Sequence, residues 1–442
     1  MIDAACRPPP RTPKDNKGIH VEAIVVEGGR PLAGTVRVGG AKNSALKLMA
    51  AALLAPGVSV LHNVPDISDV GVMAEVLERL GAHVTRDGHT LTIDATELTS
   101  YEAPYDLVVR MRASTSVLGA LVGRLGRAHV AMPGGCNIGS RKVDLHITGL
   151  TQLGVTVSTE HGYIDATGPA AGADVMLEFP SVGATENLLM ASVRASGTTV
   201  IDNAAREPEI VDLAVFLRAM GASITGAGTS TITVEGVSAL HPAEHSVVGD
   251  RIEAGTFLIA GALDSGPVTV AGFDPSHLDI VLQKLRQAGC TLEVGADEVT
   301  ISRAGSVHPV DIQTLPYPGF PTDLQAPFMA LLALADGGSV ITENVFENRF
   351  IFADEVGRMG ADIRIDGHYA LIRGVEAFSG APVRSPDLRG GAALVLAGLV
   401  AEGRTVVTDI HHIDRGYEDL VGKLRALGAE VRRLDLSGPE AA

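Results

Sequence analysis

The chain has 442 residues, a hydrophobic content of 46% and a formal net charge of −17, which together predict a globular protein of two or three domains. The acidic balance argues against nucleic acid and anionic membrane surfaces as partners, because both are bound by basic faces. Three cysteines are too few for a disulfide framework, and no apolar run reaches the roughly 18 residues that span a bilayer, so we predict a cytoplasmic protein.

The first twenty residues are polar and rich in proline. They lack the apolar stretch of a signal peptide, and we predict a disordered extension over residues 1–20. Two β-branched segments follow, AIVVEGG and GTVRVGG, within residues 23–40, and each predicts a strand. Neither segment has an obvious partner in the first three of the repeat units that come next.

From residue 42 onwards, one unit recurs six times with a period of about seventy residues. Each unit is predicted to open with a strand, which is followed by a helix that is apolar on nearly all sides and is therefore expected to be buried. A strand follows, then an amphipathic outer helix, a glycine and a strand pair. The apolar helices with their glycine stops are predicted over 42–57, 111–126, 181–197, 251–266, 321–338 and 387–403. The glycines expected to end the outer helices in a left-handed conformation are Gly81, Gly154, Gly221, Gly289, Gly360 and Gly428.

Three such units make a domain of about two hundred residues, so six units predict an α/β protein with two domains of three repeated units each. We place the hinge near HPAEHSVVGD, residues 241–250, between the third and fourth units. The sixth unit ends one strand pair short, and the N-terminal strands are therefore expected to complete the second domain. The predicted domains are 42–248 and 249–442, the latter joined by 21–41.

Basic residues occur at the starts of apolar helices, where the helix dipole disfavours a cation and favours an anion. Lys42, Arg112 and Arg389 begin the first, second and sixth of these helices. Their recurrence at equivalent positions predicts an anionic ligand, and a solvated cation beside a surface turn is the alternative. At the start of the fifth helix, Asp323 is either an N-cap or a carboxylate that takes a proton from a substrate hydroxyl.

The loop MPGGCNIGSRKVDLH, residues 132–146, departs from the repeat pattern. Cys136 lies there among glycines, five residues before Arg141. This setting favours a reactive thiol on a loop that closes over substrate. Cys290, in contrast, fills the alanine position of its repeat and is expected to be a buried apolar residue.

Two more arginines, Arg349 and Arg415, lie in strand-to-helix turns of the second half. Binding of an anionic ligand and salt bridges to Glu347 and Asp414 remain equal alternatives for them. The sequence has no metal-ligand spacing, no phosphate-binding P-loop and no dinucleotide fingerprint, so we predict neither a metal nor a cofactor.

Three glutamates near helix starts have a structural interpretation. Glu207 and Glu209 are expected to mark the start of an outer helix, and Glu253 is expected to have a structural part near the start of the fourth apolar helix.

Ten motifs occur in order over residues 21–433, namely GGAKNSAL, MRAS, PGGCNIGSRKVDLH, SVGATEN, NAAREPEIVD, DRIEAGTF, FPTDLQ, VFENRF, DLRGGAALVLAG and HIDRGYE. They resemble the motifs of the bacterial enolpyruvyl transferases that act on UDP-N-acetylglucosamine. The resemblance implies two inside-out α/β barrels. It also implies transfer of the enolpyruvyl group of phosphoenolpyruvate to the 3′-hydroxyl of UDP-N-acetylglucosamine with release of phosphate, the first committed step of peptidoglycan precursor synthesis.

The resemblance also assigns roles to residues. Those implied to bind phosphoenolpyruvate are Lys42, Asn43, Arg141 and Arg415 at its phosphate, and Arg349 and Arg389 at its carboxylate. Those implied to bind the UDP-sugar are Arg112, Arg141, Lys142, Val143, Asp144, Leu145, His146, Ser181, Val182, Gly183, Asp323 and Val345. Lys42, Asp323 and Cys136 are the implied catalytic residues, with Asp323 drawing the proton from the attacking hydroxyl.

Cys136 matches the lid cysteine of this family, which implies two roles for its thiol. One is proton donation to the methylene of phosphoenolpyruvate, and the other is reversible covalent attachment to it. Some members of the family carry aspartate at this position and resist fosfomycin, so this chain is expected to be sensitive. Phe179 and Pro180 depart from the pattern, since some members have a lysine before the SVGAT motif.

Four other kinds of protein are alternatives to this family. The sister enzyme that acts on shikimate 3-phosphate lacks the cysteine loop. A paralogue from secondary metabolism would use another nucleotide as acceptor. A regulatory paralogue would have lost Lys42, Cys136, Asp323 or Arg415, and all four are present. An RNA-processing cyclase with related repeats would need a basic surface, contrary to the net charge of −17.

Overall fold

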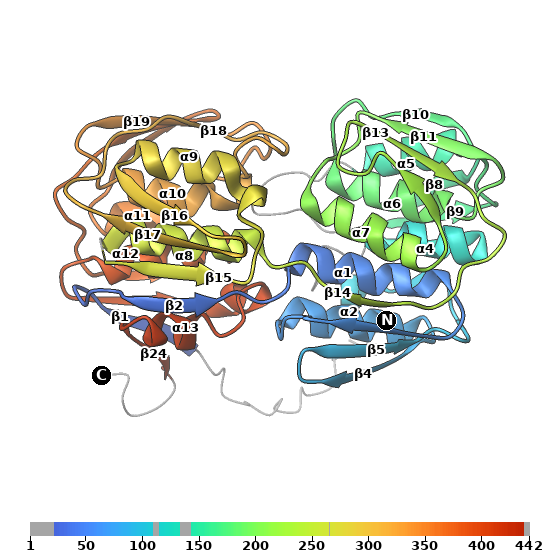
Figure 1. Ribbon diagram of the computed structural model, residues 1–442, viewed down its shortest axis with the longest axis horizontal. Helices are drawn as coiled ribbons and strands as arrows, with labels where there is room; N and C mark the ends of the chain where they lie inside the picture. The colour runs from blue at the N-terminus through green and yellow to red at the C-terminus, as the bar shows by residue number, and fades with distance from the viewer. Residues whose placement is uncertain (1–21, 109–114, 133–142, 265, 437–442) are drawn as a thin grey trace, which may run out of the picture.

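The computed structural model describes residues 22–108, 115–132, 143–264 and 266–436. Figure 1 shows two lobes, one built from α1 to α7 and the other from α8 to α13, joined by two chain crossings. The predicted extension 1–20 and four predicted site residues lie outside the described residues. These four are Arg112, Cys136, Arg141 and Lys142.

The first lobe contains three four-stranded sheets with one strand order. In each, a short edge strand runs parallel to its neighbour, and the other two pairings are antiparallel. The three sheets, with strands in spatial order, are β14 (Glu244–Ser246), β3 (Val58–His62), β5 (Thr90–Asp94) and β4 (His83–Asp87); β6 (Glu102–Ala103), β7 (Arg127–Ala131), β9 (Tyr163–Thr167) and β8 (Thr156–Glu160); and β10 (Asp174–Met176), β11 (Thr198–Asp202), β13 (Thr231–Glu235) and β12 (Ser223–Thr225).

The second lobe repeats this strand order and takes in both N-terminal strands. Its sheets are β2 (Gly34–Arg37), β15 (Val268–Ala271), β17 (Glu298–Arg303) and β16 (Cys290–Val294); β18 (Ile312–Gln313), β19 (Gly338–Thr342), β21 (Tyr369–Arg373) and β20 (Asp362–Asp366); and β22 (Pro382–Arg384), β23 (Arg404–Thr408), β1 (Glu22–Glu27) and β24 (Glu430–Asp435). Figure 1 shows β1 beside β24, the two ends of the described chain.

The N-terminal strands serve two different units. β1 lies between β23 and β24, where Val25 pairs with Val406 on one side and Arg432 on the other. β2 runs parallel to β15 in the fourth unit. The sixth unit is therefore short of one strand and not of the pair that we expected, because β24 supplies the other.

Each unit packs an apolar helix inside and an amphipathic helix outside, as the sequence predicts. The inner helices are α1 (Lys42–Ala51), α4 (Ser116–Leu125), α6 (Val182–Ser192), α8 (Arg251–Asp264), α10 (Gln325–Leu332) and α12 (Leu388–Leu399). The outer helices are α2 (Ser68–Arg79), α5 (Asp144–Gln152), α7 (Pro208–Ala219), α9 (Asp279–Gln287), α11 (Ala353–Arg358) and α13 (Leu420–Ala426). Short additions are α3 (Tyr105–Val108), η1 (Ala52–Leu54), η2 (Pro275–Leu278), η3 (Thr322–Leu324) and η4 (Ile410–Arg415).

The burial of the two helix classes follows from their composition. Helix α8 is buried along its whole length up to Leu263, whereas α9 buries one face, with Val281, Leu282 and Leu285. The six glycines that end the outer helices all have positive φ, between 78° and 106°. This confirms the predicted left-handed helix ends, which glycine adopts without strain.

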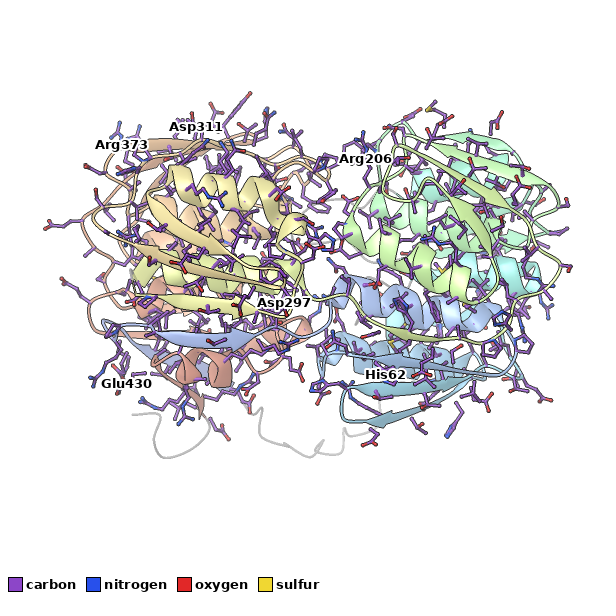
Figure 2. All side chains as sticks on the ribbon, in the orientation of Figure 1. His62, Arg206, Asp297, Asp311, Arg373 and Glu430 are labelled. Carbon is purple, nitrogen blue, oxygen red and sulfur yellow. The ribbon has the colours of Figure 1, made fainter. Side chains whose placement is uncertain are left out.

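The hydrophobic side chains form two separate cores. One draws on residues 41–247 and the other on residues 24–38 and 252–431. Charged side chains such as Asp311, Arg373 and Glu430 lie on the outside of the second lobe (Figure 2). On this division we propose the domain limits 42–248 for the first lobe, and 249–442 with 21–41 for the second. No helix in the described ranges is long and apolar enough to cross a membrane.

Candidate active site

Two arginines of the second lobe converge on Asp323, which lies in η3. Arg349 donates from Nη2 to Asp323 Oδ1 at 2.7 Å, and Arg389 donates from Nη2 to Oδ2 at 3.1 Å. Asp323 makes no helix-capping hydrogen bond, so its interpretation as an N-cap is wrong. The alternative salt bridge from Arg349 to Glu347 is replaced by the bridge to Asp323. The fifth and sixth units thus bring three predicted site residues together.

Arg349 and Arg389 keep the Asp323 carboxyl group ionised. Burial alone would raise the pKa of the Asp323 carboxyl, but Arg389 and Arg349 outweigh burial, and Lys42 contributes further. The pKa of Asp323 is therefore well below its usual range. A carboxylate in this state is a weak proton acceptor.

Arg389 has more hydrogen-bonding capacity than its neighbours use. Its side chain is 3% exposed, and its guanidinium lies 5.2 Å from the centre of the Tyr417 ring. Only Nη2 reaches Asp323, and Nε and Nη1 have no hydrogen-bond partner among the described residues. Buried guanidinium donors without partners carry a large desolvation cost, so this arrangement indicates a position for an anion.

Lys42 and Arg415 form a second group around Asp69, a residue that the sequence analysis did not single out. The Lys42 Nζ lies 2.7 Å from Asp69 Oδ2, and Arg415 donates to both carboxylate oxygens at 2.9 and 3.3 Å. The predicted alternative for Arg415 is wrong, because Asp414 pairs with Arg433. An acidic residue in the first turn of a helix is common, and that is why Asp69 passed unnoticed.

Burial and neighbouring cations perturb the ionisation of this group. Burial lowers the pKa of Lys42 to about 8; Asp69 opposes the shift, while Arg415 and Arg389 add to it. For Asp69, burial would raise the pKa, but Lys42 and the hydrogen bonds from Arg415 outweigh it and lower the pKa.

The two groups form one basic region. Lys42 influences the pKa of Asp323, and Arg389 influences the pKa of Lys42. Four cations, Lys42, Arg349, Arg389 and Arg415, face the carboxylates Asp69 and Asp323, an excess of two positive charges among these six side chains. Because the whole chain has a net charge of −17, this gathering of positive charge is particular to the site, and it suits a small polyanion.

Three of the residues predicted on the UDP side, Ser181, Gly183 and His146, meet at the start of α6. Ser181 caps this helix by accepting a hydrogen bond from the Ala184 N–H at 3.3 Å. The His146 ring lies against Gly183, since a Cβ added to Gly183 would be 3.1 Å from His146 Cε1. Asn187, which the sequence analysis missed, donates to His146 Nδ1 at 2.9 Å.

Four more residues predicted on the UDP side, Val143, Asp144, Leu145 and Val182, lie at the starts of α5 and α6. Asp144 begins α5, Val182 begins α6, and Val143, Leu145 and Val182 are half-buried against the first core. Asn43, which is predicted at the phosphate of phosphoenolpyruvate, is the second residue of α1 and is half-buried.

Val345 and Asp323 share a common support in Glu343. The buried Glu343 carboxylate accepts from the Val345 N–H at 2.8 Å and from the Thr322 hydroxyl at 2.9 Å, next to Asp323. No sequence pattern marks Glu343, because its partners Thr322 and Thr314 are more than twenty positions away.

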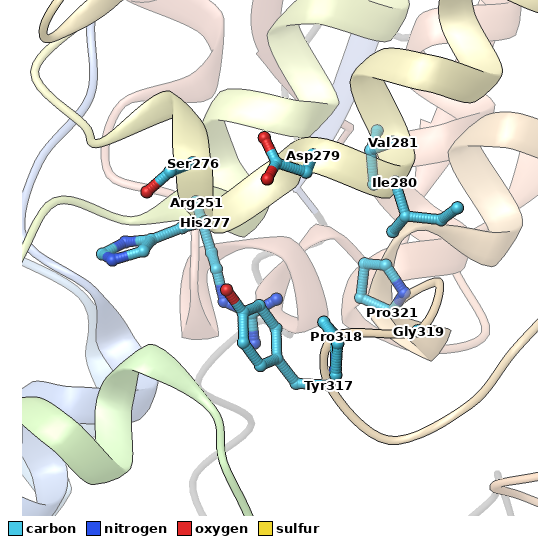
Figure 3. Close-up of a pocket in the computed structure, with 10 residues that line it drawn as sticks. All are labelled: Arg251, Ser276, His277, Asp279, Ile280, Val281, Tyr317, Pro318, Gly319 and Pro321. Carbon is cyan, nitrogen blue, oxygen red and sulfur yellow. The ribbon is translucent and has the colours of Figure 1, made fainter. Parts of the chain in front are cut away.

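A buried ion pair joins the lobes beside the hinge. Arg251, which begins α8, donates from Nε and Nη2 to the two carboxylate oxygens of Glu209 at 3.1 and 3.2 Å. Figure 3 shows the Arg251 side chain beneath the ring of Tyr317, with 5.4 Å between guanidinium and ring centre. The adjoining cavity of about 30 Å³ has room for a water molecule and not for a substrate. Glu207 precedes α7 as predicted, and Glu209 in addition binds across the lobes.

Removing one partner of this pair is expected to destabilise the protein strongly. Glu209→Ala leaves the Arg251 charge buried without its carboxylate, which costs about 3–5 kcal/mol. Urea unfolding should show a clearly lower midpoint. Glu430→Ala is the control, because its pair with Arg30 is 49–66% exposed and contributes at most about 1 kcal/mol. Equal midpoints for the two variants would contradict the expectation.

The structure contains no cluster of three or more metal-ligating side chains with suitable geometry within its described residues. Cys290 is 7% exposed, as predicted, and burial raises the pKa of its thiol to about 11.

Comparison with known proteins identifies the family. The sequence model of the EPSP synthase family (3-phosphoshikimate 1-carboxyvinyltransferase) matches residues 26–424. A relative from Corynebacterium jeikeium named UDP-N-acetylglucosamine 1-carboxyvinyltransferase is 55% identical, over 93% of this chain and 99% of its own. A relative with the same name from Mycobacterium tuberculosis is 54% identical over the same shares.

Solved structures agree with these matches. The enolpyruvyl transferase NikO from Streptomyces tendae superposes with a TM-score of 0.84 and 31% identity, over 94% of this chain and 99% of its own. An EPSP synthase from Acinetobacter baumannii, at 17% identity and a TM-score of 0.71 over 94% of this chain and all of its own, shares the fold. This chain therefore belongs to the EPSP synthase family of enolpyruvyl transferases, together with the relatives named UDP-N-acetylglucosamine 1-carboxyvinyltransferase.

Proposed function

We propose that this protein transfers the enolpyruvyl group of phosphoenolpyruvate to the 3′-hydroxyl of UDP-N-acetylglucosamine and releases phosphate. The observation that carries the proposal is the excess of two positive charges among Lys42, Arg349, Arg389, Arg415, Asp69 and Asp323, with two buried Arg389 donors that have no hydrogen-bond partner among the described residues. The names of the full-length relatives supply the acceptor. We further propose that the reaction takes place in the cytoplasm and supplies peptidoglycan for cell shape and division.

Phosphoenolpyruvate carries its phosphate and its carboxylate on the same carbon, and the basic region has two parts to match. We assign the carboxylate to Arg349 and Arg389, and the phosphate to Lys42 and Arg415, which lie on opposite lobes. Fixed cations on both groups stabilise the charge that develops as the acceptor oxygen bonds to that carbon and, later, as its bond to phosphate breaks.

Asp323 is proposed to accept the proton of the attacking hydroxyl. Arg349 and Arg389 hold its pKa low while they are paired with it. A substrate carboxylate that binds the same arginines shares their charge, which raises the pKa of Asp323 and makes it a better base. Binding of phosphoenolpyruvate thereby prepares the base for the acceptor.

Cys136 is proposed to have two roles. It donates a proton to the methylene carbon of phosphoenolpyruvate, and its sulfur forms a reversible covalent bond to the phosphoenolpyruvate molecule. Donation needs the thiol and attachment needs the thiolate, so the group must titrate near the working pH. The same nucleophile is the proposed site of fosfomycin modification.

Replacing this thiol should abolish most turnover. A serine hydroxyl is far less acidic than a thiol, so Cys136→Ser is expected to lose most of kcat and to gain no mass with fosfomycin. Cys290→Ser is the matched control, because the Cys290 thiol is buried with a raised pKa and should leave both activity and adduct unchanged. Phosphate release and intact-protein mass spectrometry provide the measurements. Full turnover by Cys136→Ser would show that the thiol is not the proton donor, and the loop would then only cover the site.

The acceptor is tested by comparing three candidate acceptors in a phosphate-release assay. Phosphoenolpyruvate is supplied with UDP-N-acetylglucosamine, UMP or shikimate 3-phosphate, and the product is identified by mass. We expect phosphate release with UDP-N-acetylglucosamine and none with UMP or shikimate 3-phosphate. Faster release with UMP would indicate a secondary-metabolism enzyme, and release with shikimate 3-phosphate would identify the sister activity. No release with any of the three would refute the proposal.

A further inference from the structure

Asp69 connects cations that belong to different lobes. It lies in the first turn of α2, next to Val70 of the first core, whereas Arg415 ends η4 between Ile413 and Tyr417 of the second core. The Asp69 side chain is 3% exposed, and both of its oxygens accept hydrogen bonds from Arg415. One of these oxygens also meets the Lys42 ammonium at 2.7 Å.

We infer that Asp69 is a positioning residue, which holds the Lys42 ammonium beside the Arg415 guanidinium of the opposite lobe and keeps Lys42 charged for phosphate binding. The inference rests on the proposed function, because the phosphate is that of phosphoenolpyruvate. Without Asp69, the two cations would repel each other across the lobes. With it, they share a carboxylate and remain together.

A purely local role for Asp69 does not account for its contacts. An acidic side chain in a first turn is stabilised by the backbone N–H groups of its own helix. Asp69 instead directs both oxygens at Lys42 and Arg415, and no capping hydrogen bond to α2 is formed. Burial of three charges is costly, so an arrangement that only stabilised the fold would be better served by apolar side chains.

The surroundings of Lys42 make Asp69 its principal counter-charge. Arg415 from η4 and Arg389 from α12 both face Lys42 and lower its pKa, while Asp69 from α2 raises it. Asp323 from η3 also interacts with Lys42. Asp250, on the chain crossing, accepts from the Lys42 backbone N–H at 3.1 Å.

Asp69→Asn tests the inference, since it removes the charge and keeps the size of the side chain. The pKa of Lys42 starts near 8 and should fall by about one to three units when this opposite charge is lost. The alkaline limb of the kcat/KM profile for phosphoenolpyruvate should move to lower pH by the same amount. At pH 8.5 this predicts a loss of about tenfold or more, with recovery toward the wild-type value at low pH.

Two further variants separate charge from shape. Asp69→Glu keeps the carboxylate and should leave the alkaline limb in place, even where kcat changes. Asp66→Asn, three residues earlier with a side chain that is 75% exposed, should change neither the limb nor KM. A loss in Asp69→Asn that is equal at every pH would show a structural role and would overturn the inference.

Direct titration of Lys42 provides a readout that does not need turnover. Side-chain NMR of the full chain with labelled lysine follows Nζ ionisation, and Lys42→Arg identifies the signal. We expect a midpoint near 8 in wild type and a lower one in Asp69→Asn. An unmoved midpoint would overturn the inference on its own. Absence of phosphate release by the wild type would instead refute the proposed function, so the two failures are distinguishable.

Discussion

Asp323→Ala is expected to lower kcat about 100- to 10,000-fold, the contribution of a positioned general base. Among the described residues, its carboxylate is the one acidic group that forms salt bridges with both Arg349 and Arg389. Because Asp323 is proposed to act on the bound acceptor, the loss should fall on kcat. Phosphate release at saturating substrates measures the effect, and Asp354→Ala, at an exposed position on α11, is the control.

The pH dependence of Asp323 gives a second test with a defined sign. Its pKa in the free protein is well below the usual range, so it is ionised throughout pH 5–8 and adds no acidic limb to kcat/KM. The kcat profile reports the substrate complex, where the arginines are shared and the pKa of Asp323 is higher. An acidic limb in kcat that disappears in Asp323→Ala is therefore expected. The same limb in both proteins would contradict the role as base.

The repeated fold could be predicted because its signals are local. An all-apolar helix, a glycine with positive φ and a β-branched strand each occupy one short window, and six copies reinforce one another. The pairing of the termini was harder, because the register of β1 against β24 joins residues more than four hundred positions apart. The sequence showed that strands were missing from the second lobe and not which unit each would join.

Some residues of the candidate site could likewise be predicted from local sequence signals, and others could not. Lys42 and Arg389 were found because they break a local rule of helix starts, and Asp323 was found because it stands where equivalent units carry a cation. Asp69 follows that rule, and its partner Arg415 lies 346 positions away, so only the structure reveals it. Glu343 and Asn187 were missed for a related reason, since Glu343 binds Thr322 and Asn187 binds His146, and both contacts join segments that are apart in the sequence. The roles of Arg112, Cys136, Arg141 and Lys142 stay predictions.

Arg389→Met is expected to weaken use of phosphoenolpyruvate by about 2–5 kcal/mol, roughly 30- to 5000-fold in kcat/KM. The variant keeps an apolar stem against Tyr417. It removes the buried donors Nε and Nη1, which have no hydrogen-bond partner among the described residues. If these donors bind the substrate carboxylate, the loss appears mainly in KM for phosphoenolpyruvate, while the affinity for UDP-N-acetylglucosamine is retained. Arg384→Met is the control, since its side chain is 74% exposed and should change kcat/KM by about twofold at most.

Arg389→Lys decides whether charge or geometry matters at this position. Lysine restores the positive charge as a point and lacks the planar set of donors, so recovery should be small. Loss of one arginine also leaves Asp323 with Arg349 as its remaining hydrogen-bond partner and raises the pKa of Asp323. The acidic limb of kcat/KM should then move upward into the measurable range in Arg389→Met and remain lower in Arg389→Lys. Full recovery of KM by lysine would show that Arg389 supplies charge alone, and the carboxylate would then have to be held by Arg349.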